Sequence, residues 1–187
     1  MTGEPGAGKT SVLRKFVENL NPQTHTHCYT PHSTINRNDL YRQINSLLNL
    51  PNRIRKVDLF AQIQKGITNF QMDSKVPFLL ILIGQPEFRE TLKRRMHEPL
   101  AQRITLRYHM AGFTSDHEAK DYVTHHLKLA GRSDPVFDES SYPILNQLGQ
   151  GLPRKIGNLA IGAMTLAIVK REQLISSDHI IQSSSGI

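Results

Sequence analysis

The residues best suited to chemistry lie at the start of the chain, which reads Gly3-Glu4-Pro5-Gly6-Ala7-Gly8-Lys9-Thr10 and fits the spacing G-x-x-x-x-G-K-[ST]. Glycines allow backbone N–H groups to curl around phosphate oxygens, because they carry no Cβ. Lys9 is expected to reach the β- and γ-phosphates of a nucleotide, and Thr10 to offer its hydroxyl to Mg²⁺. Ser11 continues into a helix, whose N-terminus adds partial positive charge. The pattern predicts a phosphate-binding loop.

The segment after this loop has the spacing of a helix. One apolar face is formed by Val12, Leu13, Phe16, Val17 and Leu20. The alternative is a glycine-rich turn that caps an ordinary helix. A chance match to the motif in a chain of this length is on the order of one per cent, so nucleotide binding is favoured.

Two features that normally accompany such a loop are missing from the sequence. Only Met1 and Thr2 precede Gly3, so we expect that a preceding strand is lost or that the true start lies upstream. We also find no apolar strand that ends in Asp or Asp-Glu, the acids that hold Mg²⁺. The long apolar run 78–83 ends at Gly84 and Gln85 instead. Phosphate binding is therefore predicted without the usual acid for hydrolysis.

Composition limits the class of protein and its partners. Lys and Arg total 23 against 16 Asp and Glu, which gives a net charge of +7 and a pI near 9.7. This excess favours polyanionic partners, although the clusters at 53–56 and 93–95 also fit solvated helix faces. A single cysteine, Cys28, is typical of a reducing compartment. With neither a signal peptide nor a transmembrane segment in the sequence, we expect a cytoplasmic protein.

The pattern of elements predicts an α/β fold. Strands are expected at 24–30, 78–83 and 104–110, and helices at 37–48, 57–70 and 89–95. After residue 111 only helices are expected, at 115–131, at 140–148, from 153 onward and after Ser176. The histidines around Cys28 lack a second cluster that would complete a tetrahedral zinc site, so a strand is favoured there. We therefore expect a parallel-sheet core over 1–111 and an all-helical lid over 112–187.

Several short sequence motifs occur in a characteristic order along the chain. They are Ile81–Glu87, Leu100–Ile104 and Gly151–Arg154, and Asn69–Ser74 and Leu129–Arg132 are two further motifs of the same kind. Together with the phosphate-binding loop they resemble AAA+ ATPases of the ExeA (general secretion pathway protein A) type, which are related to transposition ATPases. The resemblance extends from Thr2 to about Ile181. It implies an incomplete AAA+ P-loop core that carries a helical lid.

The resemblance also implies roles for particular residues. Gly3 through Ser11 would form the Walker A site for ATP and Mg²⁺, and Gln85 would be the sensor-1 residue that detects the γ-phosphate. Arg154 would be the sensor-2 arginine of the lid, or else an exposed arginine at the start of a helix. Arg103 would be an arginine finger for a neighbouring subunit, or else a salt-bridge partner at the start of the strand 104–110. An arginine finger can contribute about 10³–10⁵ in rate.

One departure from the family bears on catalysis. A strand–helix unit that carries the Walker B Asp-Glu pair, on the order of 30 residues long, is missing between Ile67 and Thr68. Hydrolysis is therefore expected to be weak or absent. Glu87 is the nearest acid to the γ-phosphate position, but it follows Pro86 and has no reason to point inward.

Three functions remain open at this stage. The first is an ATP-dependent switch in secretion or transposition, which works as a homo-oligomer or with full-length AAA+ relatives, and with DNA or a transposase as a further partner. The second is a non-catalytic nucleotide-binding or interaction fragment of a full-length relative. The third, a small-molecule P-loop kinase, is disfavoured by the all-helical lid.

Overall fold

The computed structural model describes residues 1–21, 23, 42–46, 49–51, 55–74, 79, 81–95, 98–102 and 104–185. The chain falls into two compact units, Met1–Val12 with Ile83–Ile187, and Leu13–Leu82. The expected strand 24–30 and the histidines around it lie outside the described residues. Of the expected helix 37–48, residues 42–46 are described and helical. The domain boundary near residue 111 stays a prediction.

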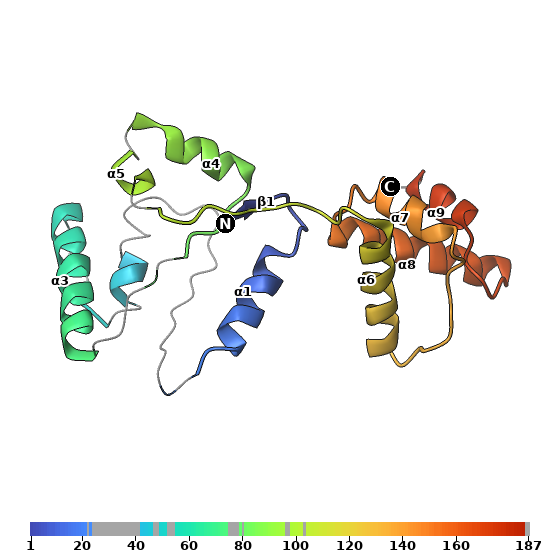
Figure 1. Cartoon of the computed structure of the whole chain (residues 1–187), viewed down its shortest axis with the longest axis horizontal. Helices are drawn as coiled ribbons and strands as arrows, with labels where there is room; N and C mark the ends of the chain where they lie inside the picture. Colours follow the sequence, from blue (N-terminus) through green and yellow to red (C-terminus); the bar gives the residue numbers. More distant parts are fainter. Residues whose placement is uncertain are drawn as a thin grey trace. The chain divides into compact units, whose positions relative to one another are not determined.

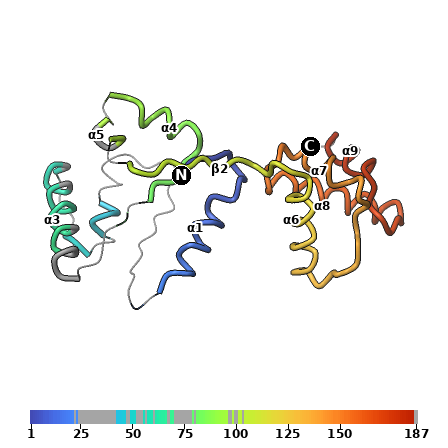
Figure 2. Tube along the Cα trace, in the orientation of Figure 1, coloured from blue at the N-terminus to red at the C-terminus, as the bar shows by residue number. Residues whose placement is uncertain are grey.

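The sheet is small and parallel. β1 (Thr2–Gly3) pairs with β2 (His109–Met110), with Thr2 opposite His109 and Gly3 opposite Met110 (Figure 2). Thr2 also forms a parallel bridge with Gly84, whose N–H donates to the Met1 carbonyl at 3.1 Å. β1 therefore lies between Gly84 and β2. The loop that follows β1 therefore starts at the carboxyl end of the middle strand. Ligands commonly bind at this end of the strands in parallel sheets.

Two expected strands are shorter than the sequence predicts. Within 78–83, the described residues carry no strand, and Leu79 and Ile81 are 70% and 41% exposed. Of 104–110 only the last two residues form β2, and Leu106 is 82% exposed. A central parallel strand needs hydrogen-bonded neighbours at its edges and helices over its faces. The predicted loss of a strand–helix unit explains why apolar runs of strand composition stay irregular here.

The helices before the lid follow the apolar periodicity of the sequence. They are α1 (Lys9–Glu18), α3 (Lys56–Ser74), α4 (Pro86–Lys93) and α5 (Glu98–Ala101). The expected helices after the loop and at 57–70 are confirmed. α4 begins three residues before the expected start at residue 89, because Pro86 fits the first turn of a helix and Gln85 is the N-cap.

The lid is a bundle with its own core. α6 (Asp116–Leu129), α7 (Ser141–Leu148), α8 (Pro153–Lys170) and α9 (Ser177–Ser184) pack on one another (Figure 1). Leu145, Ile156 and Ile180 are fully buried between them. All four lid helices were expected, and the capping box at Ser115 is formed as predicted. The lid thus buries its apolar residues between its own helices.

Candidate nucleotide-binding site

The loop between β1 and α1 has the backbone shape of a phosphate cradle. Gly6 and Gly8 adopt left-handed conformations, with φ of +88° and +92°. Residues with a Cβ rarely adopt these angles, so the glycines of the motif are required for the shape. Ala7 between them is 2% exposed, and its N–H donates to the Glu4 carbonyl at 3.1 Å. The loop then enters α1 at Lys9, which brings a helix N-terminus to the cradle.

Lys9 folds back over this loop. Its Nζ donates to the carbonyl oxygens of Gly3 at 2.6 Å and Glu4 at 2.8 Å. Burial lowers the pKa of Lys9, the nearby Arg154 lowers it further, and Glu4 opposes both effects. The ammonium group therefore has two neutral partners that phosphate oxygens can replace. Thr10, the expected Mg²⁺ ligand, is exposed on the first turn of α1.

The first turn of α8 contacts the loop directly. The N–H of Arg154, one of the helix-start donors without an intrahelical acceptor, points to the Gly6 carbonyl at 3.3 Å. A Cβ on Gly6 would lie 2.7 Å from the Cβ of Arg154, so only glycine allows this approach. The exposed Arg154 side chain therefore starts from the edge of the cradle. The structure brings together Gly6 of the glycine-rich loop and the predicted sensor-2 arginine, which are 148 residues apart in the sequence.

The segment between β2 and α6 supports both parts of the site. A Cβ on Gly3 would come within 2.6 Å of the Met110 carbonyl, and one on Gly8 within 3.3 Å of Met110 Cε. Three residues after Met110, the Phe113 N–H donates to the Gly151 carbonyl at 2.7 Å, just before α8. Met110 was not among the residues predicted for the site, and no motif in the sequence singles it out. Its role is to pack beneath the loop.

The other two predicted site residues have different outcomes. Gln85 follows Gly84, the bridge partner of Thr2, and is exposed at the N-cap of α4. It thus follows the chain segment that pairs with β1, and its sensor-1 role stays a prediction. Arg103 lies outside the described residues. Glu87 is exposed in the first turn of α4 and forms no part of the described contacts around Lys9.

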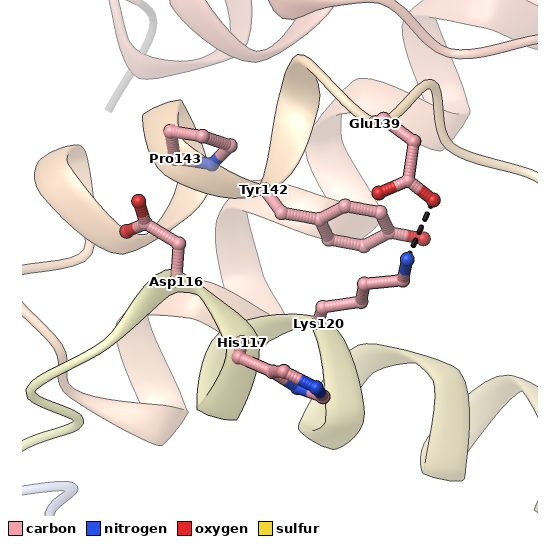
Figure 3. A pocket seen from close by; sticks show the side chains of 6 residues that line it. All are labelled: Asp116, His117, Lys120, Glu139, Tyr142 and Pro143. Carbon is pink, nitrogen blue, oxygen red and sulfur yellow. Dashed lines mark hydrogen bonds and ion pairs between the residues drawn. The ribbon is translucent and has the colours of Figure 1, made fainter.

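A shallow hollow lies on the lid surface and is separate from the loop residues. Figure 3 shows its lining by Asp116, His117, Lys120, Glu139, Tyr142 and Pro143. Lys120 donates to Glu139 at 2.6 Å, and this hydrogen bond raises the pKa of Lys120. Its ammonium group also lies 5.5 Å from the centre of the Tyr142 ring. Since its charges already pair with one another, the hollow is a poorer phosphate site than the loop.

The described part of the chain contains no cluster of three His, Cys, Asp or Glu side chains that could hold a metal ion. Thr10, the predicted Mg²⁺ ligand, therefore lies beside no such cluster among the described residues. None of the described helices is long and apolar enough to cross a membrane.

Comparison with known proteins agrees with this geometry. Residues 1–72 match the AAA domain family. The solved structure of the Thermotoga maritima RuvB Holliday junction branch migration motor superposes with a TM-score of 0.63 at 19% identity, covering 98% of this chain and 59% of that chain. The chain has an AAA+ fold. It is also 29% identical to general secretion pathway protein A of Aeromonas hydrophila. These similarities confirm the resemblance to AAA+ ATPases of the ExeA type that the sequence predicts.

The chain matches only part of the Aeromonas protein. The chain spans 37% of the length of the Aeromonas protein. The alignment covers 203 positions but 91% of this chain's 187 residues, which is about 170 residues. About 33 aligned positions of the relative therefore have no counterpart here.

Proposed function

We propose that this chain is an ATP-binding AAA+ module that acts as a nucleotide-dependent switch in the cytoplasm. The observation that carries the proposal is the contact between the Gly6 carbonyl and the N–H of Arg154 at 3.3 Å. It couples the phosphate cradle to the lid, so a ligand that changes the loop must also act on the position of α8. A switch requires such a link between a ligand site and a movable element.

In this proposal each residue of the site has a separate task. The backbone from Gly3 to Ser11 cradles the phosphates, and Lys9 leaves its two carbonyl partners to bind the β- and γ-phosphates. Thr10 binds Mg²⁺, which would neutralise charge between the terminal phosphates. Gln85 and Arg154 report on the γ-phosphate. The loop fits this ligand because its glycines, its cation and a helix N-terminus converge on one point.

Hydrolysis is proposed to be slow. About 33 aligned positions of the Aeromonas relative are missing here, which matches the expected loss of the Walker B strand–helix unit. Without that acid pair, the carboxylate that acts on Lys9 among the described residues is that of Glu4 in the exposed part of the loop, and one such acid does not replace a pair that holds Mg²⁺ and positions water. Arg103, as an arginine finger, would act only in a homo-oligomer or in a mixed assembly with full-length relatives.

Two settings suit such a switch. The name of the Aeromonas relative points to secretion, and the name of the Thermotoga motor points to work on DNA. The net charge of +7 favours the second setting, with DNA or a transposase as partner. The alternative is a non-catalytic interaction fragment of a full-length relative, which the unmatched positions also support.

The deciding experiment measures binding of a fluorescent ATP analogue to the parent chain and to Lys9→Ala. The variant is expected to lose most of its affinity, because the loop loses its cation at the β- and γ-phosphates. Lys15→Ala is the matched control, since Lys15 lies on the same helix but its side chain is 72% exposed, and its described ion pair is with Glu18 at 3.5 Å. Equal affinity of the parent and Lys9→Ala would refute the proposed nucleotide site.

A further inference from the structure

We infer that a surface around α4 and α5 binds the phosphate backbone of duplex DNA. This basic surface consists of Arg89, Lys93, Arg94, Arg95 and Arg107, whose side chains are all exposed. All five belong to the unit that contains the phosphate-binding loop. The inference extends the proposed function by naming a partner and a surface. It does not depend on ATP, so it can fail while nucleotide binding stands.

The elements bring these five cations together. Arg89 and Lys93 are four residues apart on α4, so they share one face of the helix. Arg94 and Arg95 follow where α4 ends. Arg107 follows α5 in the sequence. Its Nη2 donates to the Ala101 carbonyl at 2.8 Å, so its guanidinium group lies at the end of α5. Since α5 packs against α4, the two groups belong to one surface.

Most of this charge has no counterion within the described part of the chain. Lys93 pairs with Glu90 at 2.8 Å, but the two side chains are 64% and 67% exposed, and such pairs contribute little. No described carboxylate lies within ion-pair distance of Arg89, Arg94 or Arg95. Among the described contacts, an incoming phosphate therefore competes with water, one weak ion pair and the hydrogen bond from Arg107 to Ala101.

The distribution of charge along the chain favours a polyanion at the α4–α5 segment rather than at the lid. Within the unit that contains the phosphate-binding loop, residues 83–111 contain 6 Lys and Arg against 3 Asp and Glu, whereas residues 112–187 contain 7 against 8. The whole positive excess thus lies before the lid. Steering of a polyanion follows the summed field of such clustered charges. The lid, which is close to neutral, offers the matched control.

The chemistry of the surface favours nucleic acid over a membrane. A helix that lies on a membrane buries an exposed apolar face beneath its cations. On α4 the apolar residues Phe88 and Leu92 are half-buried, so this helix offers no such face. Four of the five cations are arginines, whose planar guanidinium groups donate two hydrogen bonds to one phosphate. Exposed arginines of this kind are suited to contacts with a sugar–phosphate backbone.

The test uses fluorescence anisotropy of a labelled random-sequence duplex, titrated with the whole chain without nucleotide at several salt concentrations. We expect Arg94→Glu with Arg95→Glu to weaken binding at least about tenfold at low salt. The same pair should reduce the slope of log affinity against log salt by about 2, one unit for each phosphate contact. Arg94→Gln with Arg95→Gln should give the same change of slope, which separates lost contacts from repulsion.

The matched control is Lys128→Glu with Arg132→Glu, which makes the same charge change on exposed residues of the lid. It should leave duplex binding within about twofold of the parent, because phosphate contacts are local. ATP-analogue binding by the Arg94/Arg95 variants verifies that they fold. Equal weakening by the lid variant, or no weakening by either, would overturn the inference. Binding to vesicles rich in anionic lipid, without binding to the duplex, would assign the surface to a membrane instead.

Discussion

At the residue scale, Gly6 links the phosphate cradle to the lid. Its positive φ shapes the loop, and its missing Cβ leaves room for Arg154. The motif alone predicts the first property, because every P-loop needs such glycines. The second depends on a contact between residues 6 and 154 that no local pattern encodes. The resemblance to ExeA-type AAA+ ATPases predicts Arg154 as a site residue. The structure gives the distance of 3.3 Å between its N–H nitrogen and the Gly6 carbonyl oxygen.

The Arg154 side chain should distinguish ATP from ADP. We expect Arg154→Ala to weaken ATP several-fold more than ADP, because a cation at the rim of the cradle acts mainly on the terminal phosphate. Titration of both nucleotides by isothermal calorimetry measures the two affinities. The backbone contact with Gly6 survives this substitution, so the loop should keep its shape.

Lys155→Ala provides the control for charge alone. Lys155 is the next residue on α8 and donates to Gln150 rather than to the loop. Its removal should change the affinities for ATP and ADP equally and slightly. If Arg154→Ala also weakens both nucleotides equally, Arg154 is a surface residue and the sensor-2 role is lost.

At the scale of elements, the sequence predicts helices better than strands. A helix makes its backbone hydrogen bonds within one segment, so the periodicity of 153–170 and the capping box at Ser115 are sufficient to place α8 and α6. A strand makes its bonds to other segments. The run 78–83 has strand composition, yet its described residues are irregular except where Gly84 meets Thr2. Its composition cannot reveal that a neighbour is missing.

The capping box of α6 should contribute to lid stability in a pH-dependent way. The N–H groups of Thr114 and Ser115 hold the pKa of Glu118 below its usual value of 4.5. The ionised form is therefore favoured by folding, so its contribution is present above pH 4.5 and is lost as the pH falls through the lower folded pKa. Glu118→Gln should thus destabilise the protein at neutral pH but progressively less in acid. Urea denaturation of the parent and the variant, followed by circular dichroism at neutral pH and at a pH below 4.5, measures this difference in the free energy of unfolding.

Ser115→Ala tests the other half of the same cap. The Ser115 hydroxyl accepts from the Glu118 N–H at 3.3 Å, and its loss should cost about 1 kcal/mol of stability. Most of this cost should persist at acidic pH, because a hydroxyl does not titrate there. A loss that disappears in acid for both variants would place the effect in the charge of Glu118 alone.

At the scale of the whole molecule, the same incompleteness that limits the sheet should limit catalysis. The motif, the lid helices and the AAA+ family resemblance were all accessible from the sequence. The position of β1 between Gly84 and β2 was not, because it depends on pairing between residues 82 and 107 positions apart. This arrangement retains the phosphate loop and the lid contact. The carboxylate that acts on Lys9 in the described part of the chain is that of Glu4, an exposed residue of the loop itself, and no Asp-Glu pair at a strand end accompanies it there.

Turnover of ATP by this chain should therefore be at least about 10²-fold below that of an intact relative, a conservative figure for the loss of metal and water positioning. Inserting a strand–helix unit that ends its strand in Asp-Glu between Ile67 and Thr68 should restore hydrolysis, since it supplies both the acids and a partner for the irregular run 78–83. The same insertion with Asn-Gln at the strand end separates these two effects, because it should restore the sheet without the activity. Steady-state phosphate release measures all three proteins. A normal rate from the chain as it stands, unchanged by Glu87→Ala, would contradict the proposed loss of the catalytic acids.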